Sequence, residues 1–209
     1  NEFQEQTVTS YQFSDGGLPS TSSFNNVCGF AGVSDGKAYM TTTAGGNSNL
    51  AFNVPKISRR MVTFETDLCL ASGYNNTGLF YNNFGDNVQW CIVSEDSAHY
   101  YLSARTSASG YGIKIKENME ADKWYKFKIC IINGGNSDIT IRYYVDGILY
   151  YETCEFYGSA SQYINKFDFQ SFLSAEATLY FDNILLSAVT PLYYDDFSES
   201  PNTWSSYAV

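Results

Sequence analysis

The chain has 209 residues, of which 44% are hydrophobic and 17% aromatic, and its net charge is −10. This composition can build a core without relying on disulfides, but an acidic chain lacks the basic surface that nucleic-acid binding needs. No run of about 18 apolar residues occurs, so membrane insertion is not expected.

Short strands are predicted along most of the chain. The N-terminal stretch to Asn26 is rich in Ser, Thr and Gly and is expected to be mostly extended coil. Beyond it, apolar and polar residues alternate between turn-forming Gly and Asn clusters. No segment has the pattern of a long amphipathic helix, and the nearest candidate, 114–123, is short and is expected to be a loop or a single turn. The predicted strands are 37–43, 49–54, 60–70, 78–83, 87–94, 98–105, 111–116, 123–133, 138–146, 148–154, 164–173 and 177–187. This series predicts an all-β fold, a two-sheet antiparallel β-sandwich of the jelly-roll type.

The five cysteines show no metal-binding spacing. They are Cys28, Cys69, Cys91, Cys130 and Cys154, and no pair forms a CxxC motif, so a zinc site is not expected. Cys69, Cys91 and Cys130 fall inside predicted strands and are expected to be buried as small apolar side chains. The sequence leaves open whether one or two disulfides form.

Aromatic and planar polar residues are dense between 74 and 111. Sugar sites combine flat rings, which stack on pyranose C–H faces, with a few polar groups that bind hydroxyls. The predicted ligand-binding residues are Tyr74, Tyr81, Asn83, Phe84, Asp86, Gln89, Trp90, Tyr101 and Arg105.

The alternation of inward and outward residues along each predicted strand assigns some of these residues to the outer face of a sheet. If the strands are neighbours, one sheet presents a polar outer face made of Glu65, Asp67, Gln89, His99, Tyr101 and Arg105. The competing interpretation is purely structural: Trp90 and Trp124 belong to the core, and Arg105 forms only a surface ion pair with Glu65 or Asp67.

Residues 123–152 predict a three-stranded meander. Phe127, Ile129, Ile131, Ile139 and Ile141 alternate with polar residues, and reversals at 133–136 and 146–147 separate the strands.

The motifs KWYKFKI at 123–129, YYVDGIL at 143–149 and YFDNI at 180–184 resemble concanavalin A-like (laminin-G-like) jelly-roll proteins, especially bacterial surface and carbohydrate-binding modules. The resemblance covers the last two-fifths of the chain well and the first half only through strand rhythm. It implies the fold, and it leaves lectins, binding modules, glycosidases and lyases open as functions.

Catalytic motifs of that superfamily are incomplete in the chain. Its glycosidases carry an E-x-D-x-x-E pattern, of which Glu65 and Asp67 supply two members while the third position is Leu70. Two carboxyls on one strand could still reach the spacing a retaining glycosidase needs. No lyase motif surrounds the single histidine, His99, and no Gly-x-Ser-x-Gly elbow occurs. We therefore expect a protein that is not an enzyme.

The resemblance also implies a structural calcium ion. Its ligands would be Asp182 of the FDN motif and an acidic residue near the N-terminus, either Glu2, Glu5 or Asp15. Calcium needs 6–8 oxygen ligands, so Asp182 alone defines little, and a solvated Asp capping a strand is the alternative. No other cofactor is expected.

Two segments of the chain share a similar sequence pattern, which suggests that the protein is built of repeated modules. FSDGGLPSTSSF at 13–24 and FSESPNTWSSY at 197–207 share a Phe-Ser-acid start and a Ser-Ser-aromatic end. We expect a sandwich over 1–192 and a tail over 193–209 that either opens a second, similar module of a tandem protein or closes the same sandwich.

The sequence thus predicts a non-catalytic carbohydrate-binding module of a secreted or cell-surface bacterial protein. Its partner would be a polysaccharide or oligosaccharide such as starch or a plant cell-wall glucan, with affinity raised by further modules of the parent chain. The alternatives are an adhesion or spacer module without sugar binding, or a glycan-active hydrolase built on Glu65 and Asp67.

Overall fold

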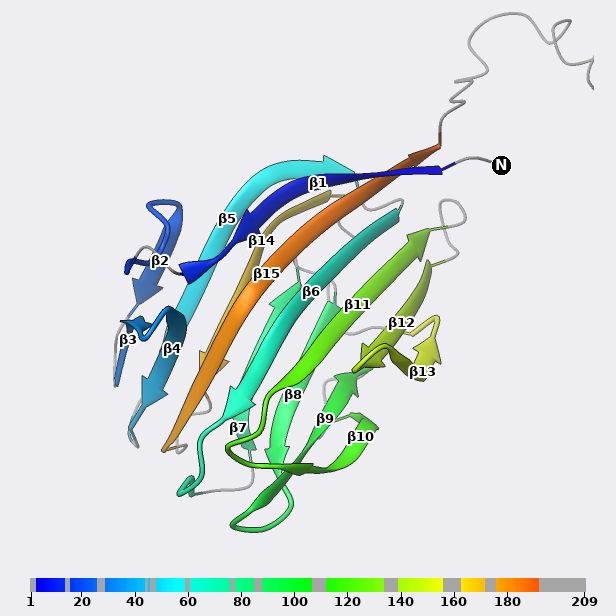
Figure 1. The fold of residues 1–209 in the computed structure, drawn as a ribbon. Coiled ribbons are helices and arrows are strands. Elements are labelled where there is room, and N and C mark those ends of the chain that lie inside the picture. Colours follow the sequence, from blue (N-terminus) through cyan, green and yellow to red (C-terminus); the bar gives the residue numbers. More distant parts are fainter. Residues whose placement is uncertain are drawn as a thin grey trace, which may run out of the picture.

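Two antiparallel sheets make up the protein in a computed structural model (Figure 1). The structure describes residues 3–13, 16–25, 29–43, 45, 48–58, 61–75, 78–84, 88–106, 112–133, 139–155, 163–171 and 176–191. The predicted tail over 193–209 therefore lies outside the described residues. No described segment is a helix of the length and apolarity that crossing a membrane requires.

Sheet A faces the viewer in Figure 1 and has eight strands. Its order is β13 (Ile148–Thr153), β12 (Ile139–Val145), β11 (Tyr125–Asn133), β6 (Met61–Leu70), β15 (Ala177–Pro191), β4 (Lys37–Thr42) and β3 (Gly29–Ser34), and β1 (Phe3–Tyr11) also pairs with β15.

Sheet B lies behind sheet A and has seven strands. Its order is β10 (Ile113–Glu120), β9 (His99–Arg105), β8 (Val88–Ser94), β7 (Gly78–Phe84), β14 (Tyr163–Ser171), β5 (Asn49–Ser58) and β2 (Ser22–Asn25). The predicted all-β two-sheet sandwich is confirmed.

The core lies between the sheets and is rich in aromatic rings. Trp90 of sheet B packs on Phe127 of sheet A with 4.4 Å between ring centroids, and Phe52 stacks on Phe167 at 4.8 Å. Because alternate residues of a strand point to opposite faces, these contacts also fix which residues of each sheet point outward.

The three paired strands of the predicted meander are confirmed, while most of its first reversal, at 133–136, lies outside the described residues. Phe127 pairs with Val145 and Ile129 with Tyr143 across β11 and β12, and all four side chains are buried. The turn between β12 and β13 places Asp146 and Gly147 at positive φ (51° and 78°), a conformation that Gly, Asn and Asp adopt more readily than other residues.

Two sequence expectations about secondary structure are wrong. The N-terminal stretch to Asn26 is not mostly coil, because it contains β1 and β2. The segment 114–123 is not a loop or turn over most of its length, because β10 extends to Glu120. Each of the twelve predicted strands matches an observed strand, from β4 to β15.

The expected burial of three cysteines is confirmed. Cys69, Cys91 and Cys130 are buried and Cys154 is exposed, and none of these four described cysteines forms a disulfide. Cys28 lies outside the described residues.

Candidate functional site

A row of planar polar side chains crosses the outer face of sheet B. Asp168 of β14 lies opposite Asn83 of β7, Asn83 lies opposite Gln89 of β8, and Gln89 lies opposite Arg105 of β9. These residues point outward because their chain neighbours, such as Phe167, Phe169 and Trp90, are buried in the core. We call Asp168, Asn83, Gln89 and Arg105 the polar row.

Hydrogen bonds order the polar row from both ends. Asn83 Nδ2 donates to Asp168 Oδ1 at 2.6 Å, and Gln170 Nε2 donates to the same oxygen at 3.1 Å. Arg105 Nη1 donates to Gln89 Oε1 at 3.3 Å. The row covers three strand spacings, about 14 Å, which suits a ligand that runs across the strands.

Asp168 is an unusual carboxyl group for an outer face, since it is only 2% exposed. Burial raises its pKa, and the hydrogen bond from Asn83, the charge of Lys166 and the hydrogen bond from Gln170 offset only part of that rise. Raised carboxyl pKa values are enriched at functional sites, although structural networks produce them too.

The floor beside the polar row is made of short side chains. Cys91 and Ser103 lie opposite each other on β8 and β9 and point outward, yet they are 1% and 0% exposed. Burial raises the pKa of Cys91 to about 11, so this thiol stays protonated near neutral pH and is a poor nucleophile. Larger residues such as Tyr101 and Arg105, both half-buried, stand beside this floor.

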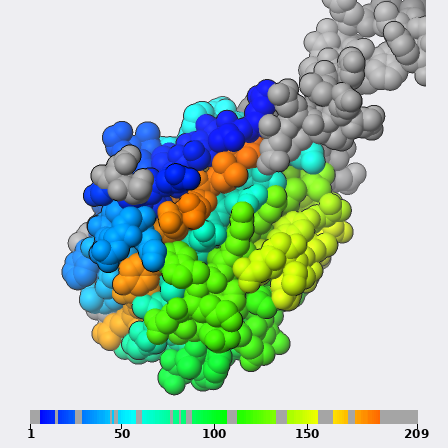
Figure 2. Space-filling model, in the orientation of Figure 1, coloured from blue at the N-terminus to red at the C-terminus, as the bar shows by residue number. Residues whose placement is uncertain are grey.

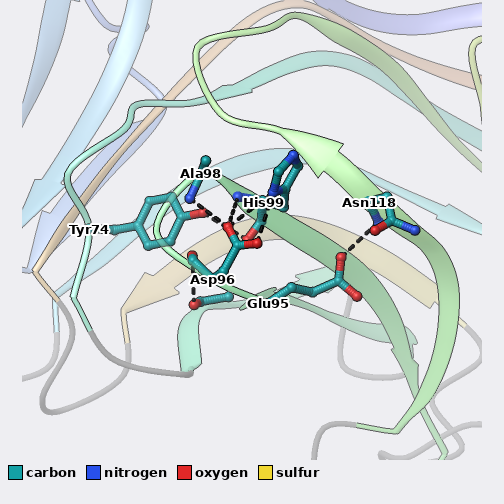
Figure 3. A network of polar contacts seen from close by, with 7 residues as sticks. Tyr74, Glu95, Asp96, Ala98, His99 and Asn118 are labelled. Carbon is teal, nitrogen blue, oxygen red and sulfur yellow. Dashed lines mark hydrogen bonds and ion pairs between the residues drawn. The ribbon is translucent and has the colours of Figure 1, made fainter.

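His99 lies at one end of the same face and is oriented by Asp96 (Figure 3). Its Nδ1 is 2.9 Å from Asp96 Oδ2, while Asp96 Oδ1 accepts the backbone N–H of Ala98 at 2.7 Å and of His99 at 2.8 Å. The Ala98 N–H and the His99 ring lower the pKa of Asp96. A carboxylate facing Nδ1 favours a proton there, which assigns Nε2 as the proton-accepting nitrogen.

Two further contacts shape this end of sheet B. Tyr74 Oη donates to the backbone carbonyl of His99 at 2.8 Å, and the backbone N–H of Asn118 donates to Glu95 Oε2 at 2.7 Å (Figure 3). On the outer face, Lys114 Nζ lies 4.6 Å from the ring centroid of Tyr101, a distance at which cation and ring attract.

Four predicted ligand-binding residues share the outer face of sheet B: Asn83, Gln89, Tyr101 and Arg105. Phe84, Trp90 and Tyr74 belong to the hydrophobic core cluster, and the Tyr74 hydroxyl already donates to the His99 carbonyl. Their place in the core corrects the prediction for these three, whereas Gln89, although only 8% exposed, lies on the outer face. The backbone of Tyr81 lies in β7, opposite Cys91, but its side chain and Asp86 lie outside the described residues. Sequence analysis missed Asp168, although alternation with Phe167 and Phe169 indicated its outward direction.

The predicted polar face that included Glu65 and Asp67 is wrong, because both belong to β6 in sheet A. Glu65 forms ion pairs with Lys128 at 2.8 Å and Lys126 at 3.2 Å. Partial burial raises the pKa of Glu65, but these two lysines outweigh that effect and the net shift is downward. Glu65 is therefore held ionised, which is unsuited to a general acid, and Arg105 cannot pair with it from the other sheet.

The calcium site stays a prediction. Asp182 lies in β15, where its Oδ1 accepts the backbone N–H of Asn183 at 2.8 Å. Glu5 pairs in β1 with Val189, seven positions along β15 from Asp182, or about 20 Å, so Glu5 does not fit as a shared ligand. Glu2 and Asp15 lie outside the described residues, within which no group of three or more His, Cys, Asp or Glu side chains could hold a metal ion.

Comparison with known proteins identifies the fold. No family model matches the chain, and no curated protein matches it. Among solved structures, an alginate lyase variant in complex with alginate trisaccharide is 14% identical with a TM-score of 0.60, and the match covers 86% of this chain and 97% of that one. An endo-β-1,4-glucuronan lyase from the fungus Trichoderma reesei is 11% identical with a TM-score of 0.58, covering 88% and 96%.

The carbohydrate recognition domain of Emp47p is 9% identical with a TM-score of 0.59, and the match covers 87% of this chain and 96% of that domain. Together these structures show that the chain shares their fold, a two-sheet jelly-roll sandwich, which is the fold that the resemblance of the sequence motifs implied. At such identities the likeness concerns the fold alone.

The expectation that the protein is not an enzyme is overturned by the same comparison. It rested on the absence of recognisable catalytic motifs, but an alginate lyase and a glucuronan lyase share this fold at 14% and 11% identity. Missing motifs at such distances therefore exclude no catalytic activity, since catalytic groups can differ while the sheets are kept.

Proposed function

We propose that the outer face of sheet B binds a polysaccharide that lies across the strands, along the polar row. The observation that carries this proposal is the row itself: a carboxyl, two amides and a guanidinium side by side over a floor of buried short side chains. Planar groups of this kind donate to and accept from sugar hydroxyls, and their mutual hydrogen bonds fix them before a ligand arrives, which reduces the entropy cost of binding.

The identity of the polymer, the location of the protein and the role of further modules are proposed from the sequence. The polymer is starch or a plant cell-wall glucan, the protein is secreted or lies on a bacterial cell surface, and further modules of the parent chain raise its affinity. They are supported by the resemblance of the sequence motifs to bacterial surface modules and by the similar sequence pattern of 13–24 and 197–207. Solved proteins of the same fold with names that refer to alginate, glucuronan or carbohydrate recognition support a carbohydrate partner.

Arg105→Ala tests the binding face. We expect affinity electrophoresis on starch, xylan, β-glucan, cellulose derivatives and alginate to show wild-type retardation on at least one polymer. The variant should lose about tenfold or more in affinity, because a charge-assisted hydrogen bond contributes about 1.5–3 kcal/mol.

Arg142→Ala is the matched control. Arg142 lies on β12 of sheet A and pairs with Glu152, so this variant has the same net charge as Arg105→Ala but an intact polar row. Equal retardation of Arg105→Ala and wild type, or no retardation of wild type on any polymer, would contradict the proposal.

Eliminative cleavage of a uronic acid polymer is a second candidate function. His99 and Tyr101 point from the same face of β9, about 7 Å apart along the strand. Asp96 orients His99, and Lys114 Nζ lies 4.6 Å from the Tyr101 ring centroid. Lys114 also forms ion pairs with Glu95 and Glu117, so a substrate carboxylate would have to displace or share with these two groups. Elimination needs a base for the proton beside the carboxylate, a cation for that carboxylate, and a proton donor for the leaving oxygen, and His99, Lys114 and Tyr101 are groups of these three kinds.

The product of elimination has a new carbon–carbon double bond conjugated with the carboxylate, which absorbs in the ultraviolet. We expect absorbance to rise when the protein is mixed with alginate or glucuronan, and His99→Ala and Tyr101→Phe to reduce the rate at least 100-fold. Arg142→Ala should keep the wild-type rate. If absorbance stays constant with both polymers, the protein does not cleave alginate or glucuronan by elimination. The binding proposal is unaffected by that result.

A further inference from the structure

A second cross-strand row, made largely of aromatic residues, lies on the outer face of sheet A. Tyr39 of β4 is opposite Tyr180 of β15, and Tyr180 is opposite Cys69 of β6. Trp124 directly precedes Tyr125, which pairs with Leu68, so Trp124 continues the row beside Cys69. We call Tyr39, Tyr180 and Trp124 the aromatic row; Figure 2 looks onto this face, with β15 in orange running between blue and green strands.

The ring of Tyr39 leans across the neighbouring strand. Gly32 of β3 lies opposite Tyr39, and a Cβ atom at Gly32 would lie 3.0 Å from Tyr39 Oη, 3.2 Å from Cζ and 3.3 Å from Cε1. Glycine therefore leaves the space that the ring occupies, and the ring covers the backbone of β3 instead of standing up from the sheet.

The other two rings are also held in place. The Tyr39 and Tyr180 ring centroids are 6.3 Å apart, within the range of favourable aromatic pairs. Lys37 Nζ lies 5.0 Å from the centroid of the Trp124 ring, a cation–π distance. All three aromatic side chains are half-buried, so their positions are set by packing while part of each remains open to solvent.

Polar groups surround these rings, which makes the surface amphipathic and not purely apolar. The hydroxyls of Thr41 and Thr178 lie 2.9 Å apart on one side of the row. On the other side, Asp182 of β15 lies opposite Asp67 of β6. An apolar protein partner or a lipid surface would remove these carboxylates and hydroxyls from water without offering them new hydrogen bonds, at a cost in free energy.

A sugar ring fits this surface because it is also amphipathic, with an apolar C–H face and polar hydroxyls. Its C–H face can cover an aromatic ring while its hydroxyls reach threonine hydroxyls and carboxylates at the edges. The carboxylates of Asp67 and Asp182, which face each other beside the row, disfavour a polyanion at this surface through like-charge repulsion. The aromatic rings, hydroxyls and carboxylates of this surface therefore favour an uncharged polymer as the ligand.

We propose that the aromatic row is a second carbohydrate-binding surface, which takes a neutral polysaccharide chain lying across β4, β15 and β6. It is separate from the polar row, because the two rows lie on the outer faces of opposite sheets with the hydrophobic core between them. The proposal does not depend on what the outer face of sheet B binds.

Tyr39→Ala and Tyr39→Phe test stacking. With starch, xylan and β-glucan as probes in affinity electrophoresis, Tyr39→Ala should lose roughly three- to tenfold in affinity for at least one polymer, the range of an aromatic contact. Tyr39→Phe should bind nearly as wild type because it keeps the ring. Tyr144→Ala removes a half-buried tyrosine from the outer side of β12 in the same sheet and should have no effect.

The same measurements in the Arg105→Ala background separate the two surfaces. If both bind, Tyr39→Ala lowers the residual affinity of Arg105→Ala further; if only the aromatic row binds, Arg105→Ala has no effect and Tyr39→Ala still does. Unchanged binding of Tyr39→Ala in both backgrounds would overturn the second surface and leave the polar row untouched.

Two other outcomes would also overturn it. One is a loss for Tyr39→Ala that Tyr144→Ala or Tyr39→Phe reproduces. The other is a wild-type dimer in sedimentation that Tyr39→Ala converts to monomer without changing polysaccharide affinity, which would assign the row to contact between copies.

Discussion

Trp90→Ala is expected to lower the free energy of unfolding by about 3–5 kcal/mol, the usual cost of truncating a large buried aromatic side chain. Trp90 is 1% exposed and contacts Phe127 of the opposite sheet at 4.4 Å and Phe169 of its own sheet at 6.4 Å between centroids. Its removal would open a cavity between the sheets, where packing is dense and relaxation is limited.

Urea unfolding followed by circular dichroism measures this loss. Domains have total stabilities of about 5–15 kcal/mol, so the variant should unfold at much lower urea concentration and melt roughly 10 °C lower or more. Trp124→Ala is the control, because Trp124 is half-buried on the outer face of sheet A and should cost far less. A Trp90→Ala variant as stable as wild type would show that the two sheets do not pack through this ring.

Asp168→Asn is expected to stabilise the protein at neutral pH and to have little effect in acid. Burial raises the pKa of Asp168 in the folded state, so the folded protein holds this proton more tightly than the unfolded chain. Wild-type stability therefore falls as pH rises from the unfolded carboxyl pKa through the higher folded value. The asparagine variant lacks this fall, and its Oδ1 can still accept from Asn83 and Gln170.

The test compares the free energies of unfolding of variant and wild type between pH 4 and pH 7. The difference should favour Asp168→Asn increasingly with pH and reach on the order of 1 kcal/mol or more near neutrality, since an ionised buried carboxyl is costly. Asp35→Asn, which removes the same charge from the exposed turn between β3 and β4, is the matched control. A variant less stable than wild type at pH 7 would mean that ionised Asp168 has stabilising partners.

Strict alternation made most strands predictable. In β12 the pattern of Ile139, Ile141, Tyr143 and Val145 against polar residues is unbroken, and the structure follows it residue by residue. The N-terminal strands were missed because their patterns are weaker: β2 has four residues, and β3 carries Gly29 and Gly32, which are poor strand formers. Hydrogen bonding of β2 to β5 and of β3 to β4 stabilises these two strands, although their own residues have little preference for strand structure.

The site was harder to predict than the strands. Alternation indicates which face of its sheet a residue points to, but it does not indicate which strands lie next to each other. Gln89 and Arg105 were placed on one outward face, and cross-strand register brings them together. Glu65 and Asp67 also point outward, yet β6 pairs with β11 and β15 in the other sheet. Phe84 was predicted to bind ligand, whereas it ends β7 on the inner side of the sheet and packs in the core.

The back-to-back placement of the polar row and the aromatic row has a consequence for mixtures with polymer. Stacked sheets lie about 10 Å apart, so one molecule that binds through both outer faces would hold two glycan chains at a fixed separation across its thickness. Each molecule would then act as a crosslink. Adding the protein to a dilute neutral glucan would raise the viscosity of the solution, even where each face alone binds weakly.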